Sequence, residues 1–255
     1  MILNKTFIWG HRGAGFIGVQ NTMTSFQNAI DMGVDGLKTE AKLSKDNEIV
    51  LCYYQSLKKN GEDVLINNLD INEIREFKLE NNESIPTLRE VFNAFKNYDI
   101  KYNFDISDPE VGIRIIELAR EFDLIEQIEI AQSAVNPNPL PVLFSKIREF
   151  DKKVTLINSI FLKHSPIEEK HLELENMRKL NIQGINVNFN FVNFELFKKI
   201  KDKGFKFYIW GVLFKRSMQK FLTMKYKEQY VDAIFSNLPD RLLRMRDELQ
   251  TSSQG

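Results

Sequence analysis

The chain has 255 residues, with 35 basic and 35 acidic side chains and a hydrophobic fraction of 43%. This is enough apolar material for one large core or two small ones, and a formal charge of zero excludes the basic footprint of a nucleic-acid-binding protein. The single cysteine, Cys52, excludes an intrachain disulfide, and no apolar run reaches the ~18 residues of a membrane span. We therefore predict a soluble cytoplasmic protein without a nucleic-acid partner.

Segments rich in β-forming residues recur along the chain, and segments with helical spacing separate most of them. The predicted strands cover residues 6–10, 34–43, 48–54, 100–106, 127–132, 153–160, 184–189, 206–212 and 231–237. The predicted helices cover residues 22–33, 87–97, 110–122, 194–204 and 217–226. This alternation is typical of a parallel sheet with helices outside it.

One junction has no helix. Only SKDN, residues 44–47, separates the second and third predicted strands, which indicates a β-hairpin because a parallel crossover needs a longer connection. Counting the hairpin as an extension of the second strand leaves eight parallel strands, and the chain length suits an eight-stranded βα barrel. We predict one such domain over residues 1–245, with a small, polar, irregular cap at about 55–85 and a disordered tail at 246–255.

A doubly wound open sheet is the alternative fold. Its first strand-to-helix turn would carry a glycine fingerprint and an acidic residue about 20 positions later at a strand end. The turn GHRGAGFIGVQNT, residues 10–22, does not have that pattern. The barrel is therefore the better interpretation.

In a βα barrel, functional side chains lie at the C-terminal ends of the strands. His11 and Arg12 end the first strand. A histidine there can transfer protons near neutral pH, and an arginine fork suits two phosphate oxygens. A histidine that only hydrogen-bonds a neighbouring loop is the alternative.

The second strand carries Lys38 and Glu40, whose spacing of two places both on one face. Symmetric pairing about the predicted turn places Tyr53 opposite Glu40 across the hairpin. On the next barrel strand, Asp105 lies within an apolar run, and a buried acid there needs a partner. An ion pair from Lys38 to Asp105 or to Glu40 would meet that need with no catalytic role, so a structural interpretation stands beside the catalytic one.

Six motifs resemble those of the glycerophosphodiester phosphodiesterases, in the same order and over nearly the whole chain. They read GHRGAGFIGVQNTMTSF, VDGLKTEAKLSKDNEIVLCYY, IPTLREVF, YNFDIS, FYIWGV and VDAIFSNLPD. The resemblance implies a βα barrel that hydrolyses a glycerophosphodiester to glycerol phosphate and an alcohol, so the implied partner is a small molecule of this kind. It also implies a divalent cation, Mg²⁺ or Ca²⁺, as cofactor.

The resemblance also implies roles for individual residues. His11 corresponds to one of the family's two acid–base histidines, and the other position holds Tyr53. The three metal-ligand positions hold Lys38, Glu40 and Asp105. An ammonium among the ligands removes an oxygen donor and repels a metal ion, and a tyrosine with a pKa of about 10 is a poor substitute for imidazole. We therefore expect a degenerate metal site without a bound cofactor.

Other positions of the family's site are mostly kept. Arg12, Asn21 and Trp210 match the family, and Gln20 replaces a glutamate. By the resemblance these four residues bind substrate. Trp210 either forms an apolar wall for the glycerol backbone or fills the barrel.

Three hypotheses follow. The first is a pseudoenzyme with an impaired or lost active site, which binds a phosphorylated glycerol compound or a protein partner. The alternative is a metal-independent phosphodiesterase in which Lys38 takes the charge role of the ion, Arg12 holds the phosphate and His11 transfers protons, with His164 as a candidate second proton carrier. Bacterial phosphatidylinositol phospholipases, which resemble this family in fold, make the same exchange of metal for a basic side chain. The third is a structural or interaction protein without a small ligand.

Overall fold

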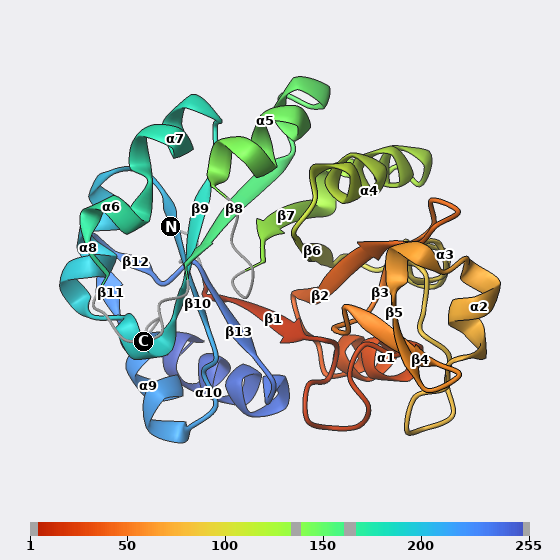
Figure 1. The fold of residues 1–255 in the computed structure, drawn as a ribbon. Helices are drawn as coiled ribbons and strands as arrows, with labels where there is room; N and C mark the ends of the chain where they lie inside the picture. The colour runs from red at the N-terminus through yellow and green to blue at the C-terminus, as the bar shows by residue number, and fades with distance from the viewer. Residues whose placement is uncertain (1–4, 134–138, 161–166, 252–255) are drawn as a thin grey trace.

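Eight parallel strands form a closed barrel in the computed structural model, which describes residues 5–133, 139–160 and 167–251 (Figure 1). Strand β1 pairs with both β13 and β2, and this double pairing closes the sheet. The barrel prediction is confirmed, and the open-sheet alternative is excluded because an open sheet keeps two unpaired edges. The barrel strands are β1 (Phe7–His11), β2 (Gly36–Leu43), β6 (Lys101–Ile106), β7 (Ile128–Gln132), β8 (Thr155–Ile160), β9 (Gly184–Asn188), β10 (Lys206–Trp210) and β13 (Ala233–Ser236).

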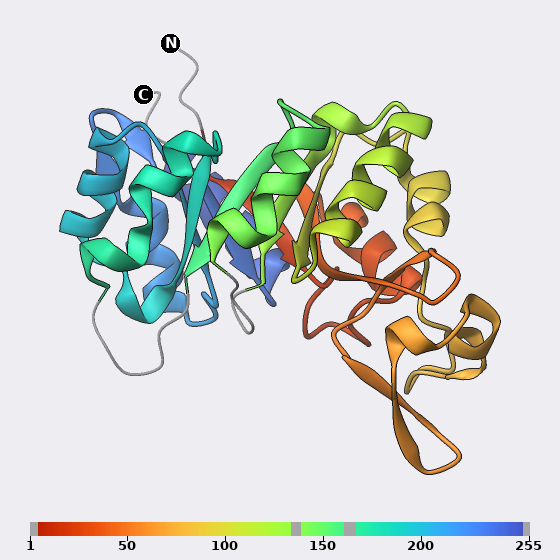
Figure 2. The same cartoon turned by 45° about the horizontal axis from the view of Figure 1, so that its top comes forward.

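Helices surround the barrel, and Figure 2 shows them along its sides. Thr22 caps the first helix by accepting a hydrogen bond from the Ser25 amide. The helices are α1 (Met23–Asp31), α3 (Leu88–Phe95), α4 (Pro109–Glu121), α5 (Leu140–Phe150), α6 (Glu169–Leu172), α7 (Leu174–Lys179), α8 (Phe194–Asp202), α9 (Lys215–Thr223) and α10 (Pro239–Thr251). Short 3₁₀ turns lie at η2 (Ile125–Gln127) and η3 (Phe189–Phe191).

The C-terminal end of the chain differs from its prediction in two places. Helix α9 ends at Thr223, and the small strands β11 (Lys225–Tyr226) and β12 (Gln229–Tyr230) replace the predicted end of the helix. Helix α10 continues to Thr251, and its Gln250 side chain donates to the Thr6 hydroxyl and the Leu222 carbonyl. The predicted disordered tail is therefore wrong for residues 246–251, because buried polar contacts hold them; residues 252–255 lie outside the described part.

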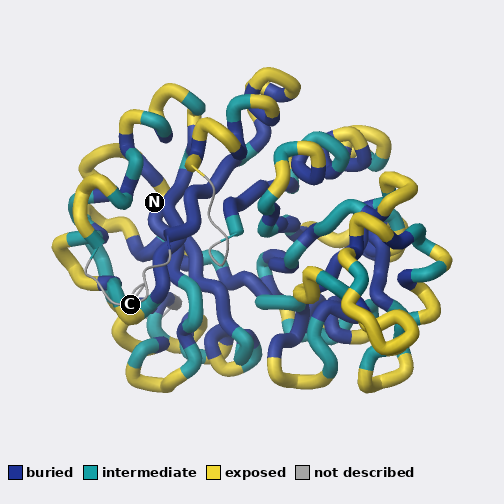
Figure 3. The backbone as a smooth tube through the Cα atoms, in the orientation of Figure 1, coloured by how far each residue is buried: buried dark blue, intermediate teal, exposed yellow. Residues whose placement is uncertain are grey.

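Apolar side chains form a core inside the barrel and a larger one between strands and helices. Figure 3 shows buried strands enclosed by helices whose outer faces are exposed. The inner cluster consists of Trp9, Ala131, Ile157, Tyr208, Ala233 and Phe235. Burial of each large apolar side chain contributes about 1.5–3 kcal/mol, so this inner layer is a stabilising plug rather than a channel.

The predicted hairpin is present, but its register is not the predicted one. Strand β3 (Ile49–Leu51) pairs antiparallel with β2, with Ala41 opposite Leu51. The Cys52 amide donates to the Glu40 carbonyl at 3.0 Å, so Glu40 lies opposite Cys52 and the predicted pairing with Tyr53 is wrong by one residue. Five residues, 44–48, separate β2 from β3 rather than the predicted four. The amide of Ser44 donates to the carbonyl of Glu48 at 2.9 Å across this turn.

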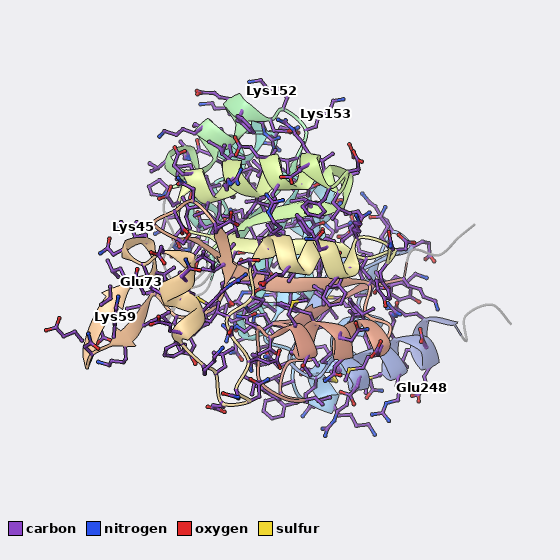
Figure 4. The ribbon with its side chains drawn as sticks, turned by 90° about the vertical axis from the view of Figure 1, so that its right-hand side faces the viewer. Lys45, Lys59, Glu73, Lys152, Lys153 and Glu248 are labelled. Carbon is purple, nitrogen blue, oxygen red and sulfur yellow. The ribbon has the colours of Figure 1, made fainter. Side chains whose placement is uncertain are left out.

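The predicted cap after β3 is present, and it contains more regular structure than the irregular segment predicted. It contains the hairpin β4 (Ser56–Lys59) and β5 (Glu62–Leu65), the turn η1 (Ile66–Asn68) and helix α2 (Ile71–Glu76). Its apolar cluster consists of Val50, Cys52, Leu57, Ile66, Leu69, Ile74 and Ile85. Lys59 and Glu73 form an ion pair across the cap, and Figure 4 places them at the end of the molecule opposite Glu248.

Helices long and apolar enough to cross a membrane are absent from the described ranges.

Candidate active site

The ends of β1, β2 and β6 bring the predicted chemical groups together. Register places His11 beside Lys38 on β1 and β2, and Glu40 beside Asp105 on β2 and β6. Arg12 directly follows β1. The five side chains therefore meet at the C-terminal mouth of the barrel, as the strand-end argument predicts.

The backbone at Arg12 adopts the left-handed region, with φ of +58°. Its amide donates to the Lys38 carbonyl at 2.6 Å, and its carbonyl accepts from the Asn21 amide and the Ser25 hydroxyl, both at 3.1 Å. Gly13 follows at φ of +85°, and a Cβ there would lie 2.5 Å from the Ser25 hydroxyl oxygen. The left-handed backbone of Arg12 is less stable than an ordinary conformation by on the order of 1–3 kcal/mol. The hydrogen bonds of its amide and carbonyl hold Arg12 in that conformation.

Arg12 and Glu40 form the first of two ion pairs at the mouth. Arg12 Nε and Nη2 each lie 2.8 Å from Glu40 Oε1, and Nη1 donates to Gln20 Oε1 at 3.1 Å. The other Glu40 oxygen accepts from Asn21 Nδ2 at 2.9 Å. The Tyr53 ring stacks on the guanidinium, with 4.2 Å between Arg12 Cζ and the ring centroid. Tyr53 therefore reaches the site although it is not the cross-strand partner of Glu40.

The charge state of Glu40 follows from these neighbours. Burial alone would raise the pKa of the carboxyl, but Arg12, His11 and Lys38 outweigh burial and lower the pKa below its usual value. Glu40 is therefore an ionised partner of Arg12 at neutral pH.

Lys38 and Asp105 form the second ion pair. Lys38 is only 3% exposed, and its Nζ lies 5.9 Å from the centroid of the Phe235 ring. Burial raises the pKa of the Asp105 carboxyl and Glu40 adds to this effect, while Lys38 acts in the opposite direction. The partner that a buried Asp105 requires is therefore the lysine of the neighbouring strand.

His11 is neutral at physiological pH. Burial lowers its pKa to about 4, and the Arg12 and Lys38 cations act in the same direction, against Glu40 and a hydrogen bond to Asn237. His11 Nδ1 lies 2.8 Å from Asn237 Oδ1. Because that oxygen can only accept, Nδ1 carries the hydrogen and Nε2 is the basic nitrogen.

Sequence reasoning did not single out Asn237 or the carboxylate inside the barrel. Asn237 is the last residue of the strand predicted at 231–237, and that position at a barrel strand end is a signal that could have identified it. Inside the barrel, Glu129 accepts from the Tyr208 hydroxyl at 2.9 Å and from Asn103 Nδ2 at 3.0 Å. Glu129 is the third position of the predicted strand at 127–132, and only the closed barrel brings these donors to it.

The remaining predicted residues differ in their position. Gln20 and Asn21 contact the Arg12 and Glu40 pair directly. Trp210 ends β10 and packs, partly buried, against the inner apolar cluster. His164 lies outside the described residues.

Two cavities adjoin the ion pairs. One of about 670 Å³ lies between the mouth and the cap, with Glu40 and Asp105 in its lining. Another of about 330 Å³ is lined by Arg12 and Gln20, and Tyr53 borders both. In residues 5–133, 139–160 and 167–251, no group of three or more His, Cys, Asp and Glu side chains is arranged to hold a metal ion.

A closed βα barrel whose mouth combines a neutral histidine, an arginine fork, a lysine and two carboxylates has the residue types of a phosphoryl-binding, acid–base site. The model of the glycerophosphoryl diester phosphodiesterase family matches residues 11–241, and the chain belongs to this family.

Relatives of known family agree with this assignment. Lysophospholipase D GDPD1 of Homo sapiens is 27% identical in an alignment of 190 residues that covers 64% of this chain and 59% of that protein, so the match spans little more than half of the relative. A glycerophosphodiester phosphodiesterase of Caldanaerobacter subterraneus is 25% identical over 94% of this chain and 98% of its own.

Two solved structures show the same fold at low identity. A phosphodiesterase of Oleispira antarctica, in complex with the product sn-glycerol-3-phosphate, has a TM-score of 0.80 and 18% identity, over 95% of this chain and 97% of that one. A glycerophosphodiester phosphodiesterase of Thermotoga maritima has a TM-score of 0.72 and 21% identity, over 94% and 98% of the two chains.

Proposed function

We propose that this protein binds the phosphoryl group of a glycerophosphodiester or of glycerol phosphate at the barrel mouth, and that metal-dependent hydrolysis is impaired or lost. The proposal includes the cytoplasmic location predicted from the sequence. The ion pair of Lys38 with Asp105 carries the proposal, because it places an ammonium group among the positions that correspond to metal ligands. The protein would then act as a binding or regulatory member of its family.

The residues present do not fit a divalent cation. Mg²⁺ and Ca²⁺ require several oxygen ligands around one point. Here Glu40 Oε1 faces two nitrogens of Arg12, Glu40 Oε2 accepts from Asn21, and Asp105 is paired with Lys38. A cation would have to displace two internal cations of the chain, so we assign it no step in the chemistry.

The same groups suit an anionic ligand. Arg12 has five N–H donors, and three of them point at Glu40 and Gln20, which leaves two for phosphate oxygens. The Lys38 ammonium adds a second positive charge to the mouth. The product complex of the Oleispira antarctica phosphodiesterase, which shares the fold, supports glycerol phosphate as the ligand class.

Thermal unfolding with glycerol 3-phosphate and turnover of glycerophosphocholine test the proposal together. We expect glycerol 3-phosphate to raise the Tm of the wild type and not of Arg12→Gln, since ligand at about 100 times its Kd adds about 2.7 kcal/mol to the stability. We expect turnover to show no increase with Mg²⁺ or Ca²⁺. A cation-dependent rate that His11→Ala abolishes would contradict the proposed loss of activity.

A second candidate is a phosphodiesterase that needs no metal. The unprotonated Nε2 of His11 supports it, because a neutral imidazole has a lone pair that can accept a proton, although burial and the two neighbouring cations make it a weak base. Lys38 and Arg12 would stabilise the charge that develops on the phosphoryl oxygens. Turnover that persists in EDTA and is lost in both His11→Ala and Lys38→Met would favour this candidate; no turnover of any diester would exclude it.

A further inference from the structure

Exposed large apolar side chains are concentrated at one end of the barrel. Of the ten such side chains in the described ranges, only Tyr98 and Phe150 lie in segments that lead into strands, at the N-terminal end. Val142 and Phe194 lie in helices α5 and α8, and the other six lie in the cap or in loops that follow strand ends: Phe16, Ile17, Tyr53, Tyr54, Leu65 and Phe214. Single exposed apolar side chains are common on protein surfaces, but apolar tips on neighbouring loops can form an interaction surface.

The loop after β1 holds two of these side chains outward. Phe16 is 59% and Ile17 40% exposed. Their amides donate to the carbonyls of Asn237 at 2.9 Å and Ala14 at 3.2 Å. Gly15 lies at φ of +63°, and a Cβ there would lie 2.2 Å from the Asn237 carbonyl oxygen. Backbone hydrogen bonds and close packing therefore fix the conformation of this loop, while the side chains of Phe16 and Ile17 point to solvent instead of packing in the core.

The loop after β10 presents the most exposed of these side chains. Phe214 is 69% exposed and is followed by two exposed cations, Lys215 and Arg216, which have no carboxylate partner in the part of the chain that is described. The Ser236 hydroxyl donates to the Val212 carbonyl at 2.7 Å and ties this loop to the end of β13. The β1 loop is bonded to Asn237, one residue further on, so the two loops flank the same strand end.

We propose that this end of the barrel docks onto a lipid bilayer surface that contains anionic headgroups. The docking rim consists of Phe16, Ile17, Phe214, Lys215 and Arg216. Apolar tips on separate loops can each enter the boundary between headgroups and acyl chains, and the adjacent cations complement anionic headgroups. The apolar tips lie on two separate loops beside a charged mouth rather than in one continuous flat patch, which favours a layer of separate headgroups over a single protein partner.

This proposal goes beyond the proposed function, because binding to a bilayer requires no turnover and no occupied mouth. The lipid surface would meet the same end of the barrel at which Arg12 and Lys38 lie. A glycerophosphodiester moiety presented at that surface would then be close to the phosphoryl-binding groups.

Vesicle flotation with the full chain tests the proposal. The probes are vesicles of phosphatidylcholine alone and of phosphatidylcholine with about one fifth phosphatidylglycerol. We expect the wild type to partition onto the anionic vesicles, Phe16→Ser and Phe214→Ser each to lower the partition coefficient about tenfold, and the double variant to lower it about a hundredfold. Lys215→Gln and Arg216→Gln should each lower it about fivefold on anionic vesicles only.

Tyr98→Ser is the matched control, since Tyr98 is an exposed aromatic residue, 42% accessible, at the opposite end of the barrel. Its partition coefficient should equal that of the wild type. The proposal is overturned if the wild type binds neither vesicle, or if Tyr98→Ser weakens binding as much as the rim variants. It is also overturned if the rim variants instead abolish a dimer measured by sedimentation, because the surface would then join two copies of the chain.

Discussion

Lys38 on β2 and Asp105 on β6 form an ion pair inside the barrel mouth, and Lys38 is 3% exposed. The neighbouring pair of Arg12 and Glu40 neutralises the other carboxylate. Two cations and two ionisable carboxyls thus occupy the place where the family resemblance implies a metal ion. The chain supplies its own positive charge there, and this arrangement determines how the site responds to substitution, to cations and to pH.

Lys38→Glu should create a site for a divalent cation. The substitution leaves three carboxyl groups at the mouth, at position 38, Glu40 and Asp105, and oxygen ligands of this kind hold Ca²⁺ and Mn²⁺. Without added cation the variant should melt roughly 10 °C below the wild type, since a buried ion pair has been replaced by repulsion that costs about 3–5 kcal/mol. Ca²⁺ should recover most of that difference.

Differential scanning calorimetry with and without Ca²⁺ measures this effect. Lys45→Glu is the control, because Lys45 is an exposed lysine in the turn between β2 and β3 and its substitution makes the same change of charge. If Ca²⁺ raises the Tm of both variants equally, it acts by general screening of negative charge, and the prediction of a specific Ca²⁺ site at position 38 is wrong.

The two halves of the buried ion pair should differ in their contribution to stability. Asp105→Asn leaves the buried Lys38 ammonium without its carboxylate and should lower the free energy of unfolding by about 3–5 kcal/mol. Lys38→Met should cost less, about 1–3 kcal/mol, because the raised pKa of Asp105 allows that group to take up a proton. Urea unfolding at neutral pH compares them, and an equal or larger loss for Lys38→Met would refute this account.

Stability should fall in mildly acidic solution because of His11. Its pKa is about 4 in the folded protein and about 6.5 when unfolded, so below about pH 6.5 the unfolded chain binds a proton that the native state does not. Between about pH 7.5 and about pH 5 this linkage should remove about 2 kcal/mol from the free energy of unfolding. His11→Gln should lack this loss of stability. Urea unfolding of both proteins at the two pH values gives the contribution of His11 as the difference between their losses. An equal loss in the two proteins would contradict the lowered pKa of His11.

Substitutions of Tyr53 test whether its ring or its hydroxyl contributes to ligand binding. If the ring supports Arg12 by stacking, Tyr53→Phe should bind glycerol 3-phosphate as the wild type does, and Tyr53→Ser should bind it about two- to fivefold more weakly, the equivalent of about 0.5–1 kcal/mol. Isothermal titration gives both values. Loss of binding or turnover in Tyr53→Phe would instead assign a role to the hydroxyl, as the position of the family's second histidine implies.

Much of the fold could be predicted because the relevant signals are local. The strand at 6–10, the hairpin around residues 44–47 and the capped helix after Thr22 each follow from residue types within a few positions, and all are present. The hairpin register could not be predicted as reliably, because it depended on a five-residue turn bonded from Ser44 to Glu48. The tail was mispredicted because its order comes from contacts of Gln250 with Thr6 and Leu222, which are remote in sequence.

By itself, the sequence determined the βα alternation, the His11 and Arg12 corner and the replacement of a carboxylate by Lys38, since these depend on the identity and order of residues. Only the tertiary structure decided that Lys38 meets Asp105, that Arg12 meets Glu40 and that His11 bonds Asn237 across 226 positions. Those pairings arise because barrel closure and strand register bring together side chains whose separation along the chain carries no information about their distance in space.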